Sequence, residues 1–541
     1  MRALKITLFF LASITLMGCV RKKEECHSVK NVIILIPDGT SVGLVTLARW
    51  YNDNNSLAID PHICGWIRTH NSDGKFPDSA PTSTAYATGV RTKAPFIGLN
   101  CNAEPRASVL ELARRKGLAT GIVATCEFPH ATPADFVCHF NNRESQNYKN
   151  LAKQFIYNSP NLVFAGGEKY LEQNGYYHLL EQNKIKLITD KKSFDNLTHF
   201  SDTCLWALFP DWQNSTKCMS YECDRDKTKA PGLSEMTDKA IKLLSKNKNG
   251  FFLMVEGSQI DWAVHNNDPY AAVNDFLEFD KAVSVALKFA KENKNTVVII
   301  CPDHGTGGIS IGNQRSGTEF IVKNPNKYDH IDIKENIIEP LKKVEWSGRK
   351  LADMMMKNPA YISEDSIKKY YYSQIDKEFV KSLRNVSKIK TNRNVSDTLQ
   401  YLLGRNMSLQ NFIGWTTTGH TAEDVFLAIY APENVKKLSG VINNYEIGKY
   451  IVEVLQLEDF DTATQELYAK YSEYFSKEEI LALTSDSLVA RKNGKELVFE
   501  ANSKVIKVNG EAKRLPSLAL WIDGVYYLPK ATNDYFGSIG K

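Results

Sequence analysis

The most constraining feature of this sequence is a set of short apolar runs that recur along the chain, each followed by turn-forming or polar residues. They read NVIILIPDG, ATGIVATC, NGFFLMVEGS, NTVVIICPDHG and DVFLAIYAP, and helical patterns such as RASVLELARRKG lie between them. Apolar runs of this kind are typical of strands buried on both faces. We therefore expect an α/β fold, a three-layer sandwich with a large, mostly parallel sheet covered by helices on both faces.

Metal-ligand side chains follow four of these runs, at the points where the predicted strands end. In parallel α/β sheets, ligands collect at the carboxyl ends of the strands. A lone Asp-Gly is usually a cap or a turn, but repetition at four strand ends favours a metal site. Oxygen and nitrogen donors suit zinc or magnesium, and no cysteines show the spacing of a structural thiolate site. The residues are Asp38, His130, Thr132, Glu256, Asp261, His265, Asp303 and His304.

The stretch FPDSAPTSTAYATGVRT, residues 76–92, places Ser79 at the start of a predicted helix. Serine is a favoured N-cap residue, and anions also bind at the positive end of a helix. Ser79 is therefore either a helix cap or a nucleophile. The stretch alone does not decide between the two.

The charge balance bears on the partners of the chain. Its 541 residues carry 67 basic and 62 acidic side chains, and two of the basic ones lie within residues 1–18. The remaining charge is close to neutral, so nucleic-acid binding has no electrostatic support.

The N-terminus MRALKITLFFLASITLMGC has a basic start, a short apolar run and a Leu-Met-Gly-Cys sequence. This pattern predicts a lipoprotein signal peptide over residues 1–18, a lipid-modified Cys19 and a tether over residues 19–30. A secretory signal with a chance cysteine is the alternative. In both cases we expect an exported protein. If Cys19 is lipidated, we expect the protein to lie in the periplasm or on the cell surface and to contact the membrane only through this lipid anchor.

Nine cysteines follow Cys19. In an oxidising compartment we expect pairs, and Cys218 and Cys223 in KCMSYECDR are close enough to close a small loop. Cys301 lies within an apolar run, and we expect it to be a buried strand residue.

Changes of character along the chain predict its organisation. Residues 31–480 form the expected catalytic domain, and a helical, lysine-rich insertion over about residues 306–410 either walls the site or forms a subunit contact. Residues 481–541 contain short β-type runs separated by Asn-Gly, Asp-Gly and Pro, which predicts a small β-rich module.

Six motifs then carry a family resemblance. NVIILIPDG, DSAPTSTAYATGVRT, HATPADFVCHFNNR, VEGSQIDWAVHNND, CPDHG and GHTAEDV occur in the order, and largely at the spacings, of the alkaline phosphatases. The chain resembles this family from about Asn31 to Pro432. The resemblance implies hydrolysis of phosphate monoesters at a site with two zinc ions and one magnesium ion, and we also expect a homodimer.

Carried over by motif, the resemblance implies three sets of metal ligands. The first zinc would bind Asp261, His265 and His420, and the second Asp303, His304 and Asp38, with Ser79 as a further ligand. Magnesium would bind Asp38, Thr132 and Glu256. Because neighbouring side chains on a strand point to opposite faces, Asp303 and His304 fit a strand end or turn.

The same resemblance assigns the catalytic steps. Ser79 would attack phosphorus and become phosphorylated, and water would then hydrolyse the phosphoserine from the opposite side. Arg143 lies eleven residues after Thr132, the family spacing for an arginine that grips two phosphate oxygens.

Two residues near the implied substrate depart from the best-known bacterial members. His130 replaces an aspartate and Trp262 replaces a lysine, although other members of the family carry each residue. Together they remove a carboxylate and a cation. We therefore expect weaker phosphate binding and an altered preference at the third metal position.

Three alternative functions remain open. A phosphodiesterase of the same superfamily would lack a residue that binds a third charged phosphate oxygen. The presence of Arg143 argues against this alternative. A sulfatase would use Ser79-Ala80-Pro81, but Ser83 stands where its modification motif needs arginine. A non-catalytic surface protein on a degenerate fold would show gaps in the ligand set.

Overall fold

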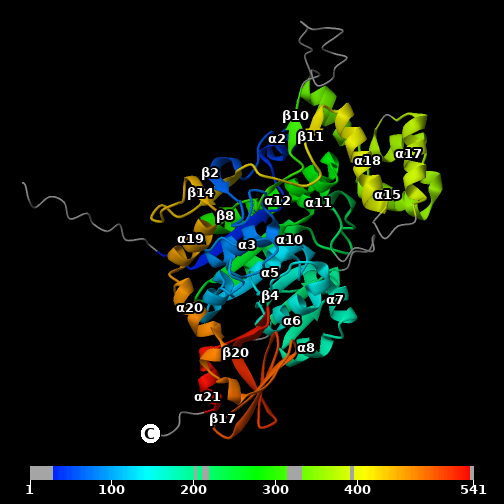
Figure 1. Cartoon of the computed structure of the whole chain (residues 1–541). Coiled ribbons are helices and arrows are strands. Elements are labelled where there is room, and N and C mark those ends of the chain that lie inside the picture. Colours follow the sequence, from blue (N-terminus) through cyan, green and yellow to red (C-terminus); the bar gives the residue numbers. More distant parts are fainter. Residues whose placement is uncertain are drawn as a thin grey trace, which may run out of the picture.

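The computed structural model describes residues 28–199, 204–209, 218–312, 332–373, 375–389 and 395–536 (Figure 1). Its centre is a ten-stranded sheet with the order β14-β2-β13-β8-β1-β7-β3-β4-β6-β5. The strands are β1 (Asn31–Pro37), β2 (Ile63–Arg68), β3 (Ala119–Glu127), β4 (Leu162–Gly166), β5 (Ile185–Ile188), β6 (Cys204–Leu208), β7 (Phe251–Gly257), β8 (Thr296–Ile300), β13 (Val425–Tyr430) and β14 (Gly440–Asn443).

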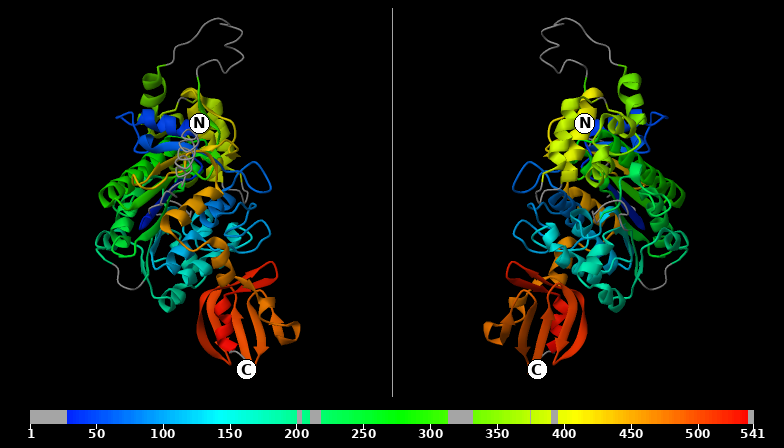
Figure 2. Two further views of the ribbon diagram at one scale, coloured as in Figure 1. Left: turned by 90° about the vertical axis from the view of Figure 1, so that its left-hand side faces the viewer. Right: turned by 90° about the vertical axis from the view of Figure 1, so that its right-hand side faces the viewer.

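Helices cover both faces of this sheet, so the predicted three-layer arrangement is confirmed. Alternate residues of β1 belong to two separate hydrophobic cores: Ile34 faces one and Leu35 the other. The side views in Figure 2 show the two helical layers on opposite sides of the sheet. The first layer contains α3 (Ser79–Thr88), α4 (Val109–Arg115), α5 (Ala131–Asp135), α6 (Tyr148–Asn158) and α19 (Tyr445–Leu455), and the second α2 (Val42–Tyr51), α10 (Leu233–Leu244) and α12 (Pro269–Asn293).

All five apolar runs form strands of the sheet. In register, Ile34 of β1 lies between Met254 of β7 and Ile299 of β8, and all three strands are parallel. Five further strands, β2, β4, β5, β6 and β14, were not predicted, because their sequences are shorter or less uniformly apolar.

Among the ten described strands of the sheet, β13 alone runs antiparallel to its neighbours β2 and β8. Just before it, β12 (His420–Thr421) pairs with β9 (Gly305–Thr306), which follows β8 closely. The chain therefore enters β13 from the edge at which the parallel strands end, and β13 runs the opposite way.

The described chain between β9 and β12 is mainly helical, as the lysine-rich segments predict. Leu351, Leu383 and Leu399 of its helices join the core of the second layer, so these helices pack on the sheet domain. Residues 313–331 lie outside the described residues. The elements are β10 (Ile309–Ile311), η4 (Lys334–Ile338), α14 (Glu339–Lys342), α15 (Gly348–Lys357), η5 (Pro359–Tyr361), α16 (Glu364–Tyr371), α17 (Lys377–Ser387), α18 (Val395–Gln410) and β11 (Ile413–Trp415).

A second, seven-stranded antiparallel sheet forms the C-terminal part of the chain, as its turn pattern predicts. At the turns, Asn493-Gly494 and Asp523-Gly524 all have positive φ, which two-residue hairpin loops of this type require. Its strands are β15 (Ala469–Lys470), β16 (Ile480–Leu483), β17 (Ser487–Lys492), β18 (Lys495–Glu500), β19 (Ser503–Val508), β20 (Glu511–Ile522) and β21 (Val525–Leu528).

Strand β20 attaches this sheet to the main domain. Leu518 and Leu520 belong to the core of the first helical layer, whereas Ala519 between them belongs to the core of the C-terminal sheet. Figure 2 shows the small sheet at the end of the molecule, next to that layer.

The remaining helices are short. They are η1 (Asp60–His62), η2 (Ser145–Asn147), α7 (Glu168–Gln173), α8 (Tyr177–Gln182), α9 (Lys191–Asp195), η3 (Glu222–Asp224), α11 (Gln259–His265), α20 (Phe460–Leu467), η6 (Tyr471–Glu473), η7 (Lys477–Glu479), η8 (Lys530–Thr532) and α21 (Asn533–Phe536).

The predicted Cys218–Cys223 disulfide is wrong. Cys223 is a free thiol in η3, where it packs against the core of the second helical layer. Burial raises the pKa of this thiol well above its usual value. Cys301 is fully buried, as expected, but it lies directly after β8 and not within the strand.

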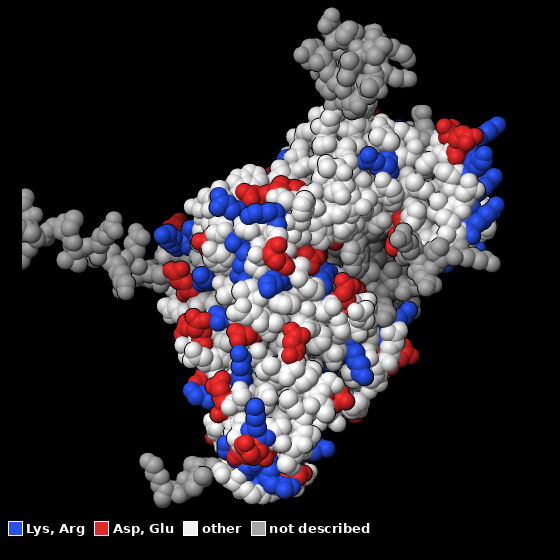
Figure 3. All heavy atoms as spheres, viewed as in Figure 1, with Lys and Arg blue, Asp and Glu red and all other residues white. Residues whose placement is uncertain are grey.

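The predicted signal peptide over residues 1–18, Cys19 and Cys26 lie outside the described part of the chain, and only residues 28–30 of the predicted tether are described. None of the described helices combines the length and apolar character needed to cross a membrane. On the face shown in Figure 3, basic and acidic side chains are interspersed.

Candidate active site

Ser79 is the first residue of α3 and is 2% exposed. The residue at the N-cap position is Asp78, whose side chain makes no capping hydrogen bond. Ser79 Oγ lies 3.2 Å from Nε2 of His304. Since Asp78 occupies the cap position, the Ser79 hydroxyl is left at the positive end of the helix, facing His304.

Asp38, Asp303 and His304 form a fully buried cluster next to Ser79. Asp38 follows β1, and Asp303 and His304 lie between β8 and β9, so the predicted strand-end position is confirmed. His304 Nε2 is 3.5 Å from Asp38 Oδ1 and 3.4 Å from Asp303 Oδ2. Burial, followed by the charges of Asp303 and Asp261, raises the pKa of Asp38 well above its usual value.

Gly39 allows the carboxylates of Asp261 and Asp303 to approach the backbone next to Asp38. Its φ is +66°, and a Cβ atom at this position would lie 2.3 Å from Oδ1 of Asp261. The backbone N–H of Gly39 donates to Oδ1 of Asp303 at 3.1 Å. A glycine after Asp38 is therefore required for this close approach.

Asp261, His265 and His420 form a second cluster. Asp261 and His265 are one turn apart on α11, with Nε2 of His265 3.2 Å from Oδ2 of Asp261. One ligand atom from each of the three residues lies within 4.8 Å of the others. Burial lowers the pKa of His265, but the Asp261 charge outweighs it and raises that pKa to about 9.

Backbone carbonyls orient both imidazoles of this cluster. His265 Nδ1 faces the Thr418 carbonyl, and His420 Nδ1 lies 2.9 Å from the Pro77 carbonyl. These contacts fix the rings with Nε2 directed away from the carbonyls, as in many metal-binding histidines.

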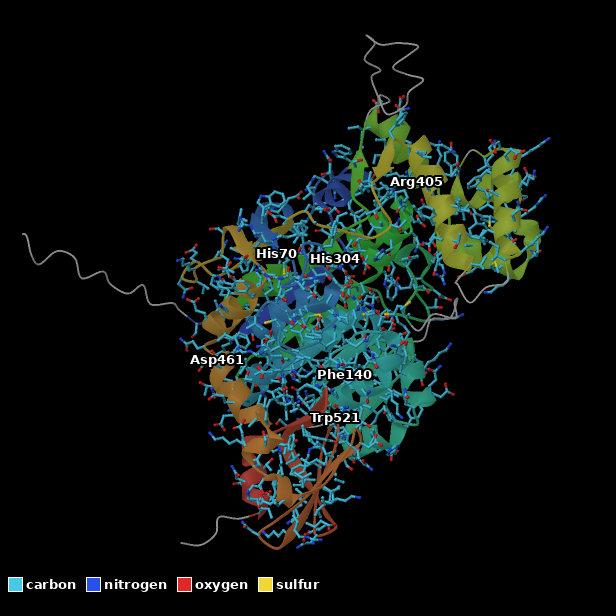
Figure 4. The ribbon with its side chains drawn as sticks, viewed as in Figure 1. His70, Phe140, His304, Arg405, Asp461 and Trp521 are labelled. Carbon is cyan, nitrogen blue, oxygen red and sulfur yellow. The ribbon has the colours of Figure 1, made fainter. Side chains whose placement is uncertain are left out.

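The two clusters adjoin. The rings of His304 and His420 stack with centroids 3.9 Å apart. Thr306 Oγ1 donates to Asp261 Oδ1 at 2.7 Å and lies 3.1 Å from His304 Nδ1. The stacked histidine rings and Thr306 thus connect the two clusters into one site. This site lies near the centre of the molecule, where His304 is labelled in Figure 4.

Glu256 and Thr132, which together with Asp38 make up the third expected ligand set, are both fully buried. Burial, followed by the charge of Asp303, raises the pKa of Glu256 to about 8. Cys126 Sγ lies 3.4 Å from Glu256 Oε2, and Cys126, His130 and Glu256 bring one ligand atom each within 4.8 Å of one another.

Arg143 lies beside Ser79 through its contacts with Asp78 and His130. Its Nη1 donates to Asp78 Oδ1 at 2.6 Å, and its Nη2 is 3.2 Å from His130 Nε2. The His130 ring also makes an edge contact with Trp262, with centroids 5.6 Å apart. Burial, followed by the Arg143 charge, lowers the pKa of His130 to about 3, so the ring is neutral.

Several ligand atoms at this site are buried without a hydrogen-bond partner. Unpaired buried carboxylates are costly, and a bound cation satisfies them. The donor chemistry and the clustering fit divalent metal ions. The atoms are both carboxylate oxygens of Asp38, Oδ2 of Asp303, Oε1 of Glu256, Oγ1 of Thr132 and Nδ1 of His130.

The site residues expected from the sequence, apart from Thr132, are joined by these contacts, but three neighbours were missed. Asp78 holds Arg143, Thr306 links the histidine clusters, and Cys126 contacts Glu256. Asp78 precedes Ser79, and Thr306 lies two residues after His304. Their position next to predicted site residues in the sequence could therefore have indicated them. Cys126 lies at the end of a strand-forming run, where it resembles any buried cysteine.

Comparison with known proteins agrees with this geometry. The profile of the alkaline phosphatase family matches residues 29–457. Alkaline phosphatase 3 of Bacillus subtilis (strain 168) is 31% identical over 457 residues, covering 81% of this chain and 91% of its own.

Solved structures share the fold. The cold-active alkaline phosphatase of Shewanella sp. is 25% identical with a TM-score of 0.66, covering 79% of this chain and 99% of its own. A variant of TAB5 alkaline phosphatase, described with magnesium in its M3 site, is 23% identical with a TM-score of 0.56, covering 80% and 100%.

Fold and site together define a metal-dependent phosphoester hydrolase. The chain belongs to the alkaline phosphatase family. It is a phosphomonoester hydrolase with a metal-binding site.

Proposed function

We propose that this chain hydrolyses phosphate monoesters through a covalent phosphoserine at Ser79. The observation that carries the proposal is the Ser79 hydroxyl at the α3 N-terminus, 3.2 Å from His304 and beside Arg143. Ser79 Oγ loses its proton to solvent and attacks phosphorus in line with the leaving alcohol, which takes up a proton from solvent as the ester P–O bond breaks. Water then attacks phosphoserine from the opposite side, which releases inorganic phosphate and restores the Ser79 hydroxyl. The helix N-terminus stabilises the negative charge in both steps.

Arg143 binds two nonbridging oxygens of the phosphoryl group. Its ion pair with Asp78 orients the guanidinium before substrate arrives. The guanidinium has five N–H donors, so donors remain for phosphate beside this ion pair. A monoester dianion carries one more negative charge than a diester, so the combined positive charge of the guanidinium and the cations favours the monoester.

Three groups of residues hold divalent cations in this proposal. Asp261, His265 and His420 hold one zinc ion, and Asp38, Asp303 and His304 hold a second zinc beside Ser79. Asp38, Thr132 and Glu256 hold a third divalent cation, for which the resemblance implies magnesium. When bound, these ions lower the pKa of the attacking hydroxyl and stabilise the charge on the leaving oxygen.

Trp262 and His130 tune the affinity for phosphate. Neither adds a positive charge near the phosphoryl group, since the Trp262 ring is uncharged and the His130 ring is neutral. Phosphate is therefore bound mainly by Arg143 and the cations. We expect fast product release and broad substrate specificity as the consequence.

Assays on three nitrophenyl substrates test the proposal: a phosphate monoester, a phosphate diester and a sulfate. We expect hydrolysis of the monoester, its loss after exhaustive chelation and its recovery with zinc. Preferential hydrolysis of the diester or the sulfate would assign the chain to the rival activities. Monoester hydrolysis that survives complete removal of zinc would falsify the proposed metal chemistry.

We also propose an exported protein anchored to a membrane through lipid on Cys19, in the periplasm or on the cell surface, and assembled as a homodimer. The support is the sequence pattern of residues 1–19 and the family resemblance. Detergent partitioning of the wild type and of Cys19→Ala tests the anchor. Light scattering of a form lacking residues 1–27 tests the dimer.

A further inference from the structure

The third cation position of this site contains a sulfur atom. Cys126, the penultimate residue of β3, is fully buried, and its Sγ is 3.4 Å from Oε2 of Glu256 on the adjacent strand β7. His130 follows four residues later at the N-cap of α5. One ligand atom from each of these three residues lies within 4.8 Å of the others.

We infer that Cys126, His130 and Glu256 bind a thiophilic divalent cation such as Zn²⁺ at the third position, in preference to Mg²⁺. This inference rests on the proposed function for the site as a whole. It replaces the magnesium that the family resemblance implies.

Two unpartnered atoms point to a ligand at this position. Nδ1 of His130 and Oε1 of Glu256 are buried without a hydrogen-bond partner, and the two residues are 7% and 0% exposed. A buried thiol could be a simple packing residue, but this one contacts a carboxylate whose other oxygen, Oε1, lacks a partner, and it lies near His130, whose Nδ1 also lacks one. That combination is costly without a cation.

The donor chemistry favours zinc over magnesium. Mg²⁺ takes oxygen ligands in a near-octahedral shell and keeps several waters, whereas thiolate and imidazole ligands select zinc. A tetrahedral zinc binds sulfur at about 2.3 Å and carboxylate oxygen at about 2.0 Å, which places the two ligand atoms about 3.5 Å apart. The separation between Cys126 and Glu256 is 3.4 Å.

Binding of a cation to His130 changes the hydrogen bonding of Arg143. Nε2 of His130 lies 3.2 Å from Nη2 of Arg143, so the neutral ring accepts that hydrogen bond. Coordination through Nδ1 requires the ring proton on Nε2, which then cannot accept from Arg143. The cation therefore frees Nη2 for phosphate, and the thiol proton of Cys126 is released to solvent.

Cobalt substitution tests the inference independently of activity. Co²⁺ replaces Zn²⁺, and a thiolate ligand gives a charge-transfer absorption in the near ultraviolet. We expect this band in the fully loaded wild type, its loss in Cys126→Ser and Cys126→Ala, and its retention in Cys138→Ser. Cys138 is the matched control, because it is equally buried but its Sγ contacts the Leu151 carbonyl.

Metal analysis after dialysis against zinc with excess magnesium provides the second readout. We expect the Cys126 variants to retain one zinc ion fewer per chain than the wild type and Cys138→Ser. The absence of the cobalt band in the wild type, or equal zinc content in wild type and Cys126→Ser, overturns the inference. Because the first outcome concerns the wild type, it holds even if a variant fails to fold.

The two proposals fail separately. If the protein hydrolyses monoesters but shows no cobalt–thiolate band, the proposed function stands and the sulfur ligand is refuted. If it shows the band but does not hydrolyse monoesters, the sulfur ligand stands and the proposed function is refuted.

Discussion

The Ser79 hydroxyl lies 3.2 Å from Nε2 of His304, although 225 positions separate the two residues in the chain. One belongs to the start of α3 and the other to the turn after β8. The sheet brings them together at the edge where its parallel strands end, which is where such folds bind ligands.

Replacing Ser79 by alanine should abolish turnover, because it removes the only atom to which phosphate is transferred in the proposed mechanism. Metal content should stay within error of the wild type, as measured by elemental analysis. Ser83→Ala is the matched control, since Ser83 is also buried in α3 and its Oγ has no partner. Full activity in Ser79→Ala would contradict the assignment.

Replacing Arg143 by alanine should lower kcat/KM for a monoester by about 100-fold, corresponding to about 2.7 kcal/mol of lost transition-state binding. Arg143→Lys should recover part of this loss, because lysine keeps the charge but not the bidentate fork. Steady-state kinetics measures both. Arg106→Ala, which breaks an ion pair with Asp461 instead, should leave kcat/KM unchanged.

Introducing lysine at Trp262 should tighten product inhibition, since it adds a cation beside the phosphate-binding region. The inhibition constant of inorganic phosphate should fall, and turnover should slow if product release limits the rate. Trp262→Phe keeps an uncharged ring and is the control. An inhibition constant that does not change in Trp262→Lys would remove the proposed role of this position.

Cation uptake by the metal-free protein should depend on pH. The Asp261 charge, acting against burial, raises the pKa of His265 to about 9, and burial with Asp303 raises that of Glu256 to about 8. Both groups are protonated below these values and must lose their protons to bind a cation. Zinc affinity should therefore rise up to about pH 9, by about tenfold per pH unit for each proton displaced. Competition with a chelating dye measures it, and a flat profile would refute the coupling.

Glu256 should also make the stability of the metal-free protein depend on pH. Its pKa is raised from 4.5 to about 8 in the folded state, so the folded chain holds a proton that the unfolded chain releases. Stability from this group falls as pH rises between these values. We expect the Tm of chelated protein to decrease across this range, and zinc to reverse the decrease. Equal Tm values with and without zinc would argue against a cation at this carboxylate.

Much of the fold could be predicted because buried parallel strands have a distinctive sequence. The run NVIILIP is apolar at successive positions, and β1 uses them for two cores, with Ile34 on one face and Leu35 on the other. The outer strands could not be predicted, because their sequences are less uniformly apolar. In β2, Ile63 and Trp66 remain partly exposed, so its sequence lacks a uniform apolar character.

The residues of the active site likewise divide into those that the sequence predicts and those that it does not. Residues that supply metal-ligand atoms stand out by type and by position at strand ends, as Asp38 directly after β1 and Glu256 near the end of β7 do. Residues that act through neighbours do not: Asp78 holds Arg143 across a sequence separation of 65, and nothing local in the sequence predicts that ion pair. The wrong disulfide at Cys218 and Cys223 has a related cause, because short spacing does not specify where each thiol packs.

Trapping the phosphoenzyme tests the central claim most directly. The protein is mixed with a phosphate monoester at mildly acidic pH, where hydrolysis of phosphoserine is slow, quenched with strong acid and digested for mass spectrometry. We predict one phosphate on the peptide containing Ser79, and none in Ser79→Ala. An active enzyme whose Ser79 peptide never carries phosphate, or a phosphate on another residue in both proteins, would contradict the account.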